Sequence, residues 1–140
     1  MRGDRVTSKI IAYFRDLESS LLECVAVADY TVLRYEVTAT DGKMRLRAQL
    51  QNGGQLDLFE YIALNSQEQL LRLKYSYHWQ SADGQLVQRW DVVNHHPHLP
   101  HAPQHVHLPD GQVQGVDPAP SITTVLDEIS ANLRMETPNT

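Results

Sequence analysis

The stretch that decides the fold reads Tyr75-Ser76-Tyr77-His78-Trp79-Gln80-Ser81-Ala82-Asp83-Gly84-Gln85-Leu86-Val87-Gln88-Arg89-Trp90-Asp91. Apolar and polar residues alternate on both sides of Asp83-Gly84, which is the pattern of two antiparallel strands joined by a tight turn. Counting outward from a type I′ turn gives four predicted cross-strand pairs: Trp79 with Gln88, His78 with Arg89, Tyr77 with Trp90, and Ser76 with Asp91. The pattern therefore predicts a hairpin with one aromatic face and one polar face.

The two faces of this hairpin have different expected roles. The aromatic face should pack beneath helices, and it consists of Tyr75, Tyr77, Trp79, Leu86 and Trp90. The other face presents Ser76, His78, Arg89 and Asp91. This face is either a solvated surface with ordinary cross-strand pairs or a site at which an imidazole, a guanidinium and a carboxylate meet.

Upstream of the hairpin, the sequence predicts a helix followed by more strands. Apolar residues recur every three or four positions from Asp4 to about Glu23, as in an amphipathic helix. From Tyr30 the period changes to two, and Asp41-Gly42 is expected to form a two-residue turn. That turn would give the pairs Tyr35 with Ala48, Glu36 with Arg47, and Val37 with Leu46.

The orientation of Glu60 depends on the next turn, Asn52-Gly53-Gly54. A strict two-residue turn would place Glu60 beside Arg47 on the polar side, where it would form a surface ion pair. An odd-length loop or a bulge would instead turn Glu60 inward, where it would need a partner such as an Arg or a His. The sequence leaves both alternatives open, and Glu60 is kept as a candidate site residue.

After Asp91 the composition changes before a final helix begins. Asn94 to Asp117 is rich in His and Pro and has no sustained period, which predicts a long loop of the kind that often carries function. Ser121 then opens a helix with an apolar stripe from Ile122 to Leu133. We therefore expect one α+β domain over residues 1–140. It would consist of an antiparallel sheet of about five strands in hairpins, flanked by an N-terminal and a C-terminal helix, with residues 136–140 frayed.

Composition limits the function classes. The 140 residues carry a formal net charge of -5, which argues against a surface coated in positive potential but not against a local basic site. No apolar segment is long enough for a membrane span or a signal peptide, so a cytoplasmic protein without membrane contact is expected. Cys24 is the only cysteine and is expected to fill the core. An unpaired edge strand makes a homodimer reasonable.

Six of the seven histidines lie between His95 and His107, and two kinds of chemistry follow from them. Metal-free cleavage of a phosphodiester needs a base, an acid, and a cation that stabilises the developing charge. Two histidines and Arg89 would supply these groups, and Asp91 would orient one ring. The candidate catalytic residues are His78, Arg89, Asp91, His96, His105 and His107, with Glu60 in addition.

The alternative chemistry uses a divalent metal such as zinc. On an extended strand, His105-Val106-His107 would point both rings to one side, and His96 or His78 would add a further ligand. The spacing matches no specific zinc motif, so the favoured hypothesis has no cofactor.

The sequence resembles the TumE-type toxins of bacteria and archaea over roughly Lys9 to Leu133. The resemblance is carried by Leu58-x-Glu60, Tyr75 to Gln80, Asp83-Gly84, Arg89-Trp90-Asp91, His95-His96-Pro97, His105-Val106-His107 and Val125 to Ile129. It implies a type II toxin-antitoxin pair, in which a partner with a helix-turn-helix domain neutralises the toxin. It implies neither the target nor the catalytic residues.

Together, the residues and the resemblance predict a toxin that acts on RNA or on another nucleic-acid or nucleotide substrate, through a metal-independent, ribonuclease-like activity. Two other classes stay open: a non-catalytic binding or regulatory module, and a metal-dependent hydrolase that uses the histidine-rich segment.

Overall fold

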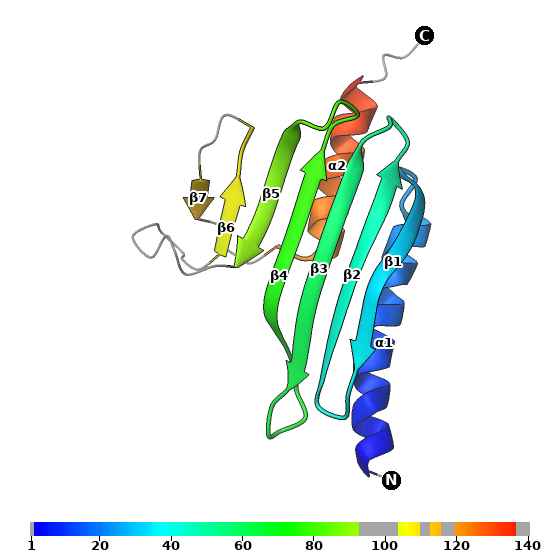
Figure 1. Ribbon diagram of the computed structural model, residues 1–140, viewed down its shortest axis with the longest axis vertical. Helices are drawn as coiled ribbons and strands as arrows, with labels where there is room; N and C mark the ends of the chain where they lie inside the picture. Colours follow the sequence, from blue (N-terminus) through cyan, green and yellow to red (C-terminus); the bar gives the residue numbers. More distant parts are fainter. Residues whose placement is uncertain (1, 93–103, 110–112, 116–119, 137–140) are drawn as a thin grey trace.

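The computed structural model describes residues 2–92, 104–109, 113–115 and 120–136, and it confirms the predicted α+β class. One antiparallel sheet has its strands in the order in which they occur in the chain, and both helices lie on the same face of it (Figure 1). The elements are α1 (Arg2–Glu23), β1 (Val27–Val37), β2 (Asp41–Leu50), β3 (Gln55–Leu64), β4 (Leu70–Gln80), β5 (Leu86–Val92), β6 (Gln104–His107), β7 (Val113–Gly115) and α2 (Ile122–Glu136).

The core lies between the helices and one face of the sheet. α1 buries the apolar face that its spacing predicts, with Ile10, Phe14 and Leu21 fully buried. α2 begins after Ser121, whose Oγ accepts a hydrogen bond from the backbone N–H of Thr124 at 3.3 Å, as expected of a helix cap. Its buried stripe is Ile122, Val125, Leu126 and Ile129. Cys24 is half-buried at the end of α1, and its Sγ lies 3.4 Å from Ser130 Oγ on α2.

The register of the β4–β5 hairpin is the predicted one. The observed pairs are Ser76 with Asp91, Tyr77 with Trp90, His78 with Arg89, and Trp79 with Gln88. Of the predicted aromatic face, Leu86 is half-buried and the other members, Tyr75, Tyr77, Trp79 and Trp90, are buried. The turn itself is wider than a two-residue turn, because Ser81 N–H donates to Gln85 O. A bulge next to Trp79 restores the predicted register.

The register predicted for β1 and β2 is wrong. Tyr35 pairs with Met44 and not with Ala48, Glu36 pairs with Lys43 and not with Arg47, and Val37 pairs with Gly42 and not with Leu46. The turn lies earlier than Asp41-Gly42, because Thr38 N–H donates to Asp41 O at 2.9 Å.

Close packing of α1 explains why Gly42 lies in β2 and not in the turn. A Cβ at Gly42 would lie 2.6 Å from Ile10 Cγ2 and 2.8 Å from Phe14 Cε2. The glycine therefore allows α1 to lie close to β2. Gly42 is needed for this close contact and not for the geometry of a turn.

The β2–β3 connection decides the orientation of Glu60. Leu50 N–H donates to Gly54 O, so three residues, Gln51 to Gly53, form an odd-length loop. Leu46 then pairs with Leu58, and Met44 pairs with Glu60. Glu60 consequently faces inward with the apolar side chains, and its exposed fraction is 0%.

The histidine- and proline-rich segment contains more regular structure than expected. The predicted loop from Asn94 to Asp117 includes two short strands: β6, which pairs with β5, and β7, which pairs with β6. Over the described residues the sheet therefore has seven strands, against a prediction of about five. The rest of this segment lies outside the described residues. Neither α1 nor α2 has an apolar stretch long enough to span a bilayer.

Gly42→Ala should lower the free energy of unfolding by about 1–3 kcal/mol, because the added methyl group overlaps Ile10 and Phe14 and forces α1 away from β2. Urea denaturation followed by circular dichroism measures this loss. Gly84→Asn is the matched control: Gly84 has φ +86° and no heavy atom within 4 Å of an added Cβ, and Asn tolerates this backbone conformation. Equal stability of the Gly42→Ala variant and the wild type would contradict the packing argument.

Candidate functional site

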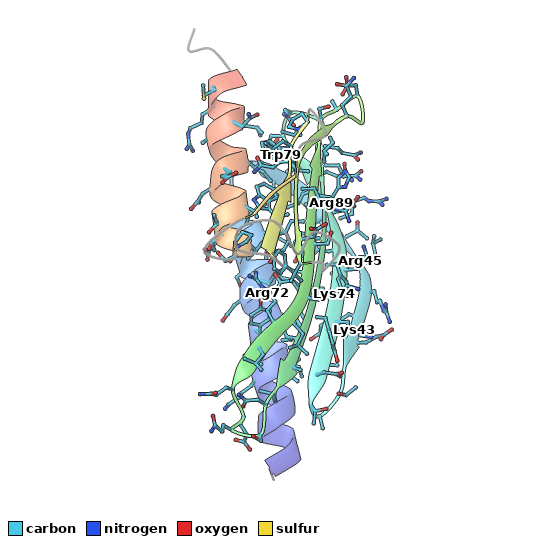
Figure 2. The ribbon with its side chains drawn as sticks, turned by 90° about the vertical axis from the view of Figure 1, so that its left-hand side faces the viewer. Lys43, Arg45, Arg72, Lys74, Trp79 and Arg89 are labelled. Carbon is cyan, nitrogen blue, oxygen red and sulfur yellow. The ribbon has the colours of Figure 1, made fainter. Side chains whose placement is uncertain are left out.

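The open face of the sheet carries its polar residues in rows that cross the strands. One row consists of Arg34, Arg45, Phe59, Ser76 and Asp91 on β1 to β5. A second row consists of Arg47, Asp57, His78 and Arg89 on β2 to β5, and a third of Lys43, Tyr61 and Lys74 on β2 to β4. Figure 2 shows Lys43, Arg45, Lys74 and Arg89 on the side of the sheet away from the helices, whereas Arg72 and Trp79 point toward the helices.

Strand pairing brings His78, Arg89 and Asp91 together, as predicted. Arg89 Nε lies 3.2 Å from Asp91 Oδ2, and the guanidinium side chain is 42% exposed while the carboxylate side chain is 3% exposed. His78 lies directly opposite Arg89 in the register and is half-buried. Asp91 thus lies at the base of the site and holds Arg89, while Arg89 presents its charge to solvent.

The predicted histidines of the downstream segment are only partly placed. β6 pairs with β5 so that His105 lies opposite Asp91, and His107 lies opposite Arg89. The backbone register therefore brings both positions to the edge of the site. His96 lies outside the described residues. Within the described part of the chain, no group of three or more His, Cys, Asp or Glu residues is arranged to hold a metal ion. The alternative set of His96, His105 and His107 remains a prediction.

Glu60 belongs to the opposite face and does not join this site. Tyr13 donates a short hydrogen bond to Glu60 Oε1, and Tyr77 donates to Glu60 Oε2 at 2.6 Å. Arg72 Nη1 in turn donates to the Tyr77 hydroxyl at 2.7 Å. The predicted surface ion pair between Glu60 and Arg47 is therefore not formed, and that alternative is wrong. An inward carboxylate was expected to need an Arg or a His, but two phenols solvate it directly and the arginine acts through one of them.

The tyrosines around Glu60 stay protonated over the physiological pH range. Burial, with the charge of Glu60 and the hydrogen bonds to it, raises the pKa of Tyr13 and of Tyr77. Burial also raises the pKa of Tyr75 to about 12, although the nearby guanidinium of Arg72 opposes the shift. Because Tyr13 is on α1, Glu60 on β3 and Tyr77 on β4, this buried network connects the helix to the centre of the sheet.

A hollow on the open face contains several residues that the sequence did not single out, together with Ser76 and Arg89. Its volume is about 640 Å³, and it is lined by Arg34, Lys43, Arg45, Phe59, Tyr61, Lys74, Ser76 and Arg89. Five of these residues are cationic and none is acidic. We refer to it as the cationic hollow. Its signal in the sequence is the pair of basic residues at alternate positions of β2, Lys43 and Arg45.

A larger cavity lies elsewhere, where the end of α1 meets α2. Its volume is about 780 Å³, and its lining includes Cys24, Ser130, Glu23, Asp127 and Arg134. Charges of both signs are mixed there, and none of His78, Arg89 and Asp91 lines it. Size alone therefore does not identify the functional site, and the cationic hollow has the stronger chemical signal.

The folded protein should lose stability as the pH rises from 10 toward 12. The ordinary tyrosine pKa is 10.0, and it is raised in the folded state for Tyr13, Tyr75 and Tyr77. Below pH 10 these tyrosines contribute their full stabilisation. Above pH 10, each tyrosine that stays protonated in the folded state but ionises in the unfolded state lowers the free energy of unfolding by about 1.4 kcal/mol per pH unit. Urea denaturation at stepped pH, with tyrosinate absorbance, measures this. Reversible titration of all six tyrosines near pH 10 in the folded protein would contradict it.

Comparison with known proteins identifies the family. The family model described as Toxin TumE matches residues 15–133, which include strands β1 to β7, the second part of α1 and most of α2. Neither the curated proteins nor the solved structures contain a significant match. The matched region includes the whole cationic hollow and His78, Arg89 and Asp91. On this match, the chain belongs to the TumE toxin family.

Proposed function

We propose that this protein is the toxin of a type II toxin-antitoxin pair and that it acts on RNA through the open face of its sheet. The observation that carries the proposal is the cationic hollow, whose lining has five cations and no carboxylate and shares Arg89 with the His78, Arg89 and Asp91 cluster. Phosphodiesters are the anions that such a surface would meet in a nucleic acid.

The local charge of the open face supports an anionic substrate, although the protein as a whole carries a net negative charge. The formal net charge is -5, but several carboxylates on the open face are already engaged. Glu36 pairs with Arg34 at 2.8 Å, and Asp57 pairs with Arg47 at 2.8 Å. Asp41 accepts a hydrogen bond from the Tyr61 hydroxyl at 2.9 Å. The remaining positive potential is concentrated where the polar rows cross β2 to β5.

The proposed chemistry is general acid-base cleavage without a cofactor. His78 would move a proton at the attacking or the leaving oxygen, and Arg89 would stabilise the negative charge that develops on phosphorus-bound oxygen. Asp91 would position the guanidinium of Arg89, in place of the imidazole that the sequence suggested. His105 or His107 would supply the second imidazole from β6, because the register places them opposite Asp91 and Arg89.

The proposed partners follow from the toxin role. A helix-turn-helix antitoxin would neutralise the protein by covering its basic face, and both would act in the cytoplasm, where RNA is accessible. A homodimer would form along β1, the long edge strand of the sheet. Exposed apolar side chains on that strand include Val32 at 38%, Leu33 at 50% and Tyr35 at 46%.

Expression of the protein without an antitoxin should arrest growth, and the double variant Arg89→Ala, His105→Ala should relieve the arrest, because it removes the charge-stabilising cation and one acid-base group. Colony counts after induction should recover by at least about tenfold, since removal of one transition-state donor costs about 10²–10³ in rate. Arg15→Ala is the control, because Arg15 is exposed on α1. Growth arrest that persists in the double variant, at equal protein level, would refute the site.

Co-expression with a small helix-turn-helix protein encoded beside this gene should restore growth and give a complex that co-purifies. The complex should form less readily in 1 M than in 0.1 M salt, because its contacts with the basic face are electrostatic and are screened over about 3 Å against about 10 Å. Size-exclusion chromatography at both salt concentrations measures this. Loss of toxin activity on treatment with a chelator would instead favour the metal-dependent hydrolase.

A further inference from the structure

We infer that the cationic hollow binds a single strand of nucleic acid, with a base stacked on Tyr61 and phosphates held by Lys43, Arg45 and Lys74. The inference rests on the proposed function for its biological role and deepens it, because it names the form of the substrate and the residues that hold it. It concerns binding alone, so it can be tested apart from cleavage.

Three cations of the hollow are available to a ligand. Within the described residues, Lys43, Arg45 and Lys74 form no ion pair with a carboxylate, whereas Arg34, Arg47 and Arg89 each do. Arg45 is exposed, and so is Lys74. A phosphate that approaches these three groups therefore displaces no carboxylate among the described residues, and counterion release favours its binding.

Two of these cations are held in place by aromatic rings. Arg45 Cζ lies 4.8 Å from the centroid of the Phe59 ring, and Lys43 Nζ lies 5.2 Å from that of Tyr61. Phe59 is only 9% exposed, so it supports Arg45 from below and is not itself a stacking surface. Such contacts restrict long side chains before a ligand arrives, which reduces the entropic cost of binding.

Tyr61 is the ring that a base can reach. It is half-buried, and its hydroxyl donates to Asp41 Oδ2 at 2.9 Å, which fixes the ring at its far end. Its row places Lys43 on one neighbouring strand and Lys74 on the other. Lys43 Nζ lies over the face of the ring, so a base that stacks on Tyr61 takes the place of this ammonium group, which is then available to a phosphate. A ring with cationic residues on both neighbouring strands suits a nucleotide, which has both an aromatic base and an anion.

The size of the hollow favours a single strand over a duplex. Ser76 is the smallest side chain of its lining and lies between Phe59 and Asp91 in the register, so little side-chain volume fills the hollow at that position. Its volume of about 640 Å³ is in the range of sites for small ligands, and would hold one or a few nucleotides. A duplex keeps its bases inside and would offer only phosphates and sugars to Tyr61.

The test is a binding titration by fluorescence anisotropy at several salt concentrations, in a His78→Ala background that does not cleave. The probes are 12-nucleotide RNA and DNA strands of the same unstructured sequence, the matching RNA duplex, and heparin as a polyanion without bases. The variants are Tyr61→Ala, Tyr61→Phe, and the triple variant Lys43→Ala, Arg45→Ala, Lys74→Ala. Arg15→Ala, Arg134→Ala is the control and removes two exposed charges on the helical side.

Tyr61→Ala should weaken single-strand binding about tenfold, because stacking of one base is lost, whereas Tyr61→Phe should stay within about twofold of the parent. The triple variant should weaken binding to every probe and lower the salt slope by about 2, since each phosphate contact on a single strand contributes about 0.7. The control on the helical side should match the parent. Binding of either single strand supports the inference, and a preference between them tells RNA from DNA.

Two results would overturn the inference: equal affinity for single strand, duplex and heparin, or no effect of Tyr61→Ala. Each would mean a simple polyanion surface. These failures are separable from failure of the proposed function. If the binding pattern is found but growth arrest survives Arg89→Ala, His105→Ala, the catalytic site is wrong and the binding surface stands. If that double variant relieves arrest but no single strand binds, the binding inference is wrong and the proposed catalytic site stands.

Discussion

The alternation of side chains along β3, β4 and β5 is the constraint on which the rest of the structure depends. Because successive residues point to opposite faces, the pairs Leu58 with Tyr77 and Tyr77 with Trp90 fix one face as core across three strands. The helices cover that face alone (Figure 1). A one-residue slip at either pairing would bury the cations and expose the aromatic rings, so packing and the candidate site are specified by the same register.

The one carboxylate that this register buries in the core shows how the fold tolerates it. Glu60 faces inward because an odd-length loop precedes β3, and desolvation would make it costly without partners. The hydroxyls of Tyr13 and Tyr77 satisfy its two oxygens, and Arg72 supplies a positive charge at one remove. Glu60 therefore contributes to the attachment of α1, while the chemistry proposed for this toxin lies on the other face.

Charge distribution, more than net charge, connects the fold to its proposed function. An acidic chain still presents five cations around one hollow, because strands bring together residues that are far apart in sequence, from Arg34 to Arg89. Membership of the TumE family identifies a toxin and leaves its target open. Single-stranded RNA is the proposed substrate because the open face combines cations without carboxylate partners among the described residues, the ring of Tyr61, and the His78, Arg89 and Asp91 cluster.

The sequence by itself determined the α+β class, both helices and the β4–β5 pairs, because local period and turn signals specify which residues alternate. It could not determine the β1–β2 register, since the position of Gly42 depends on the approach of α1, which is distant in sequence. Nor could it determine on which face of the sheet Glu60 lies, or which residues come together to form the cationic hollow. Those features depend on loop parity and on cross-strand neighbours, and only the assembled sheet, with its helices on one face, decides them.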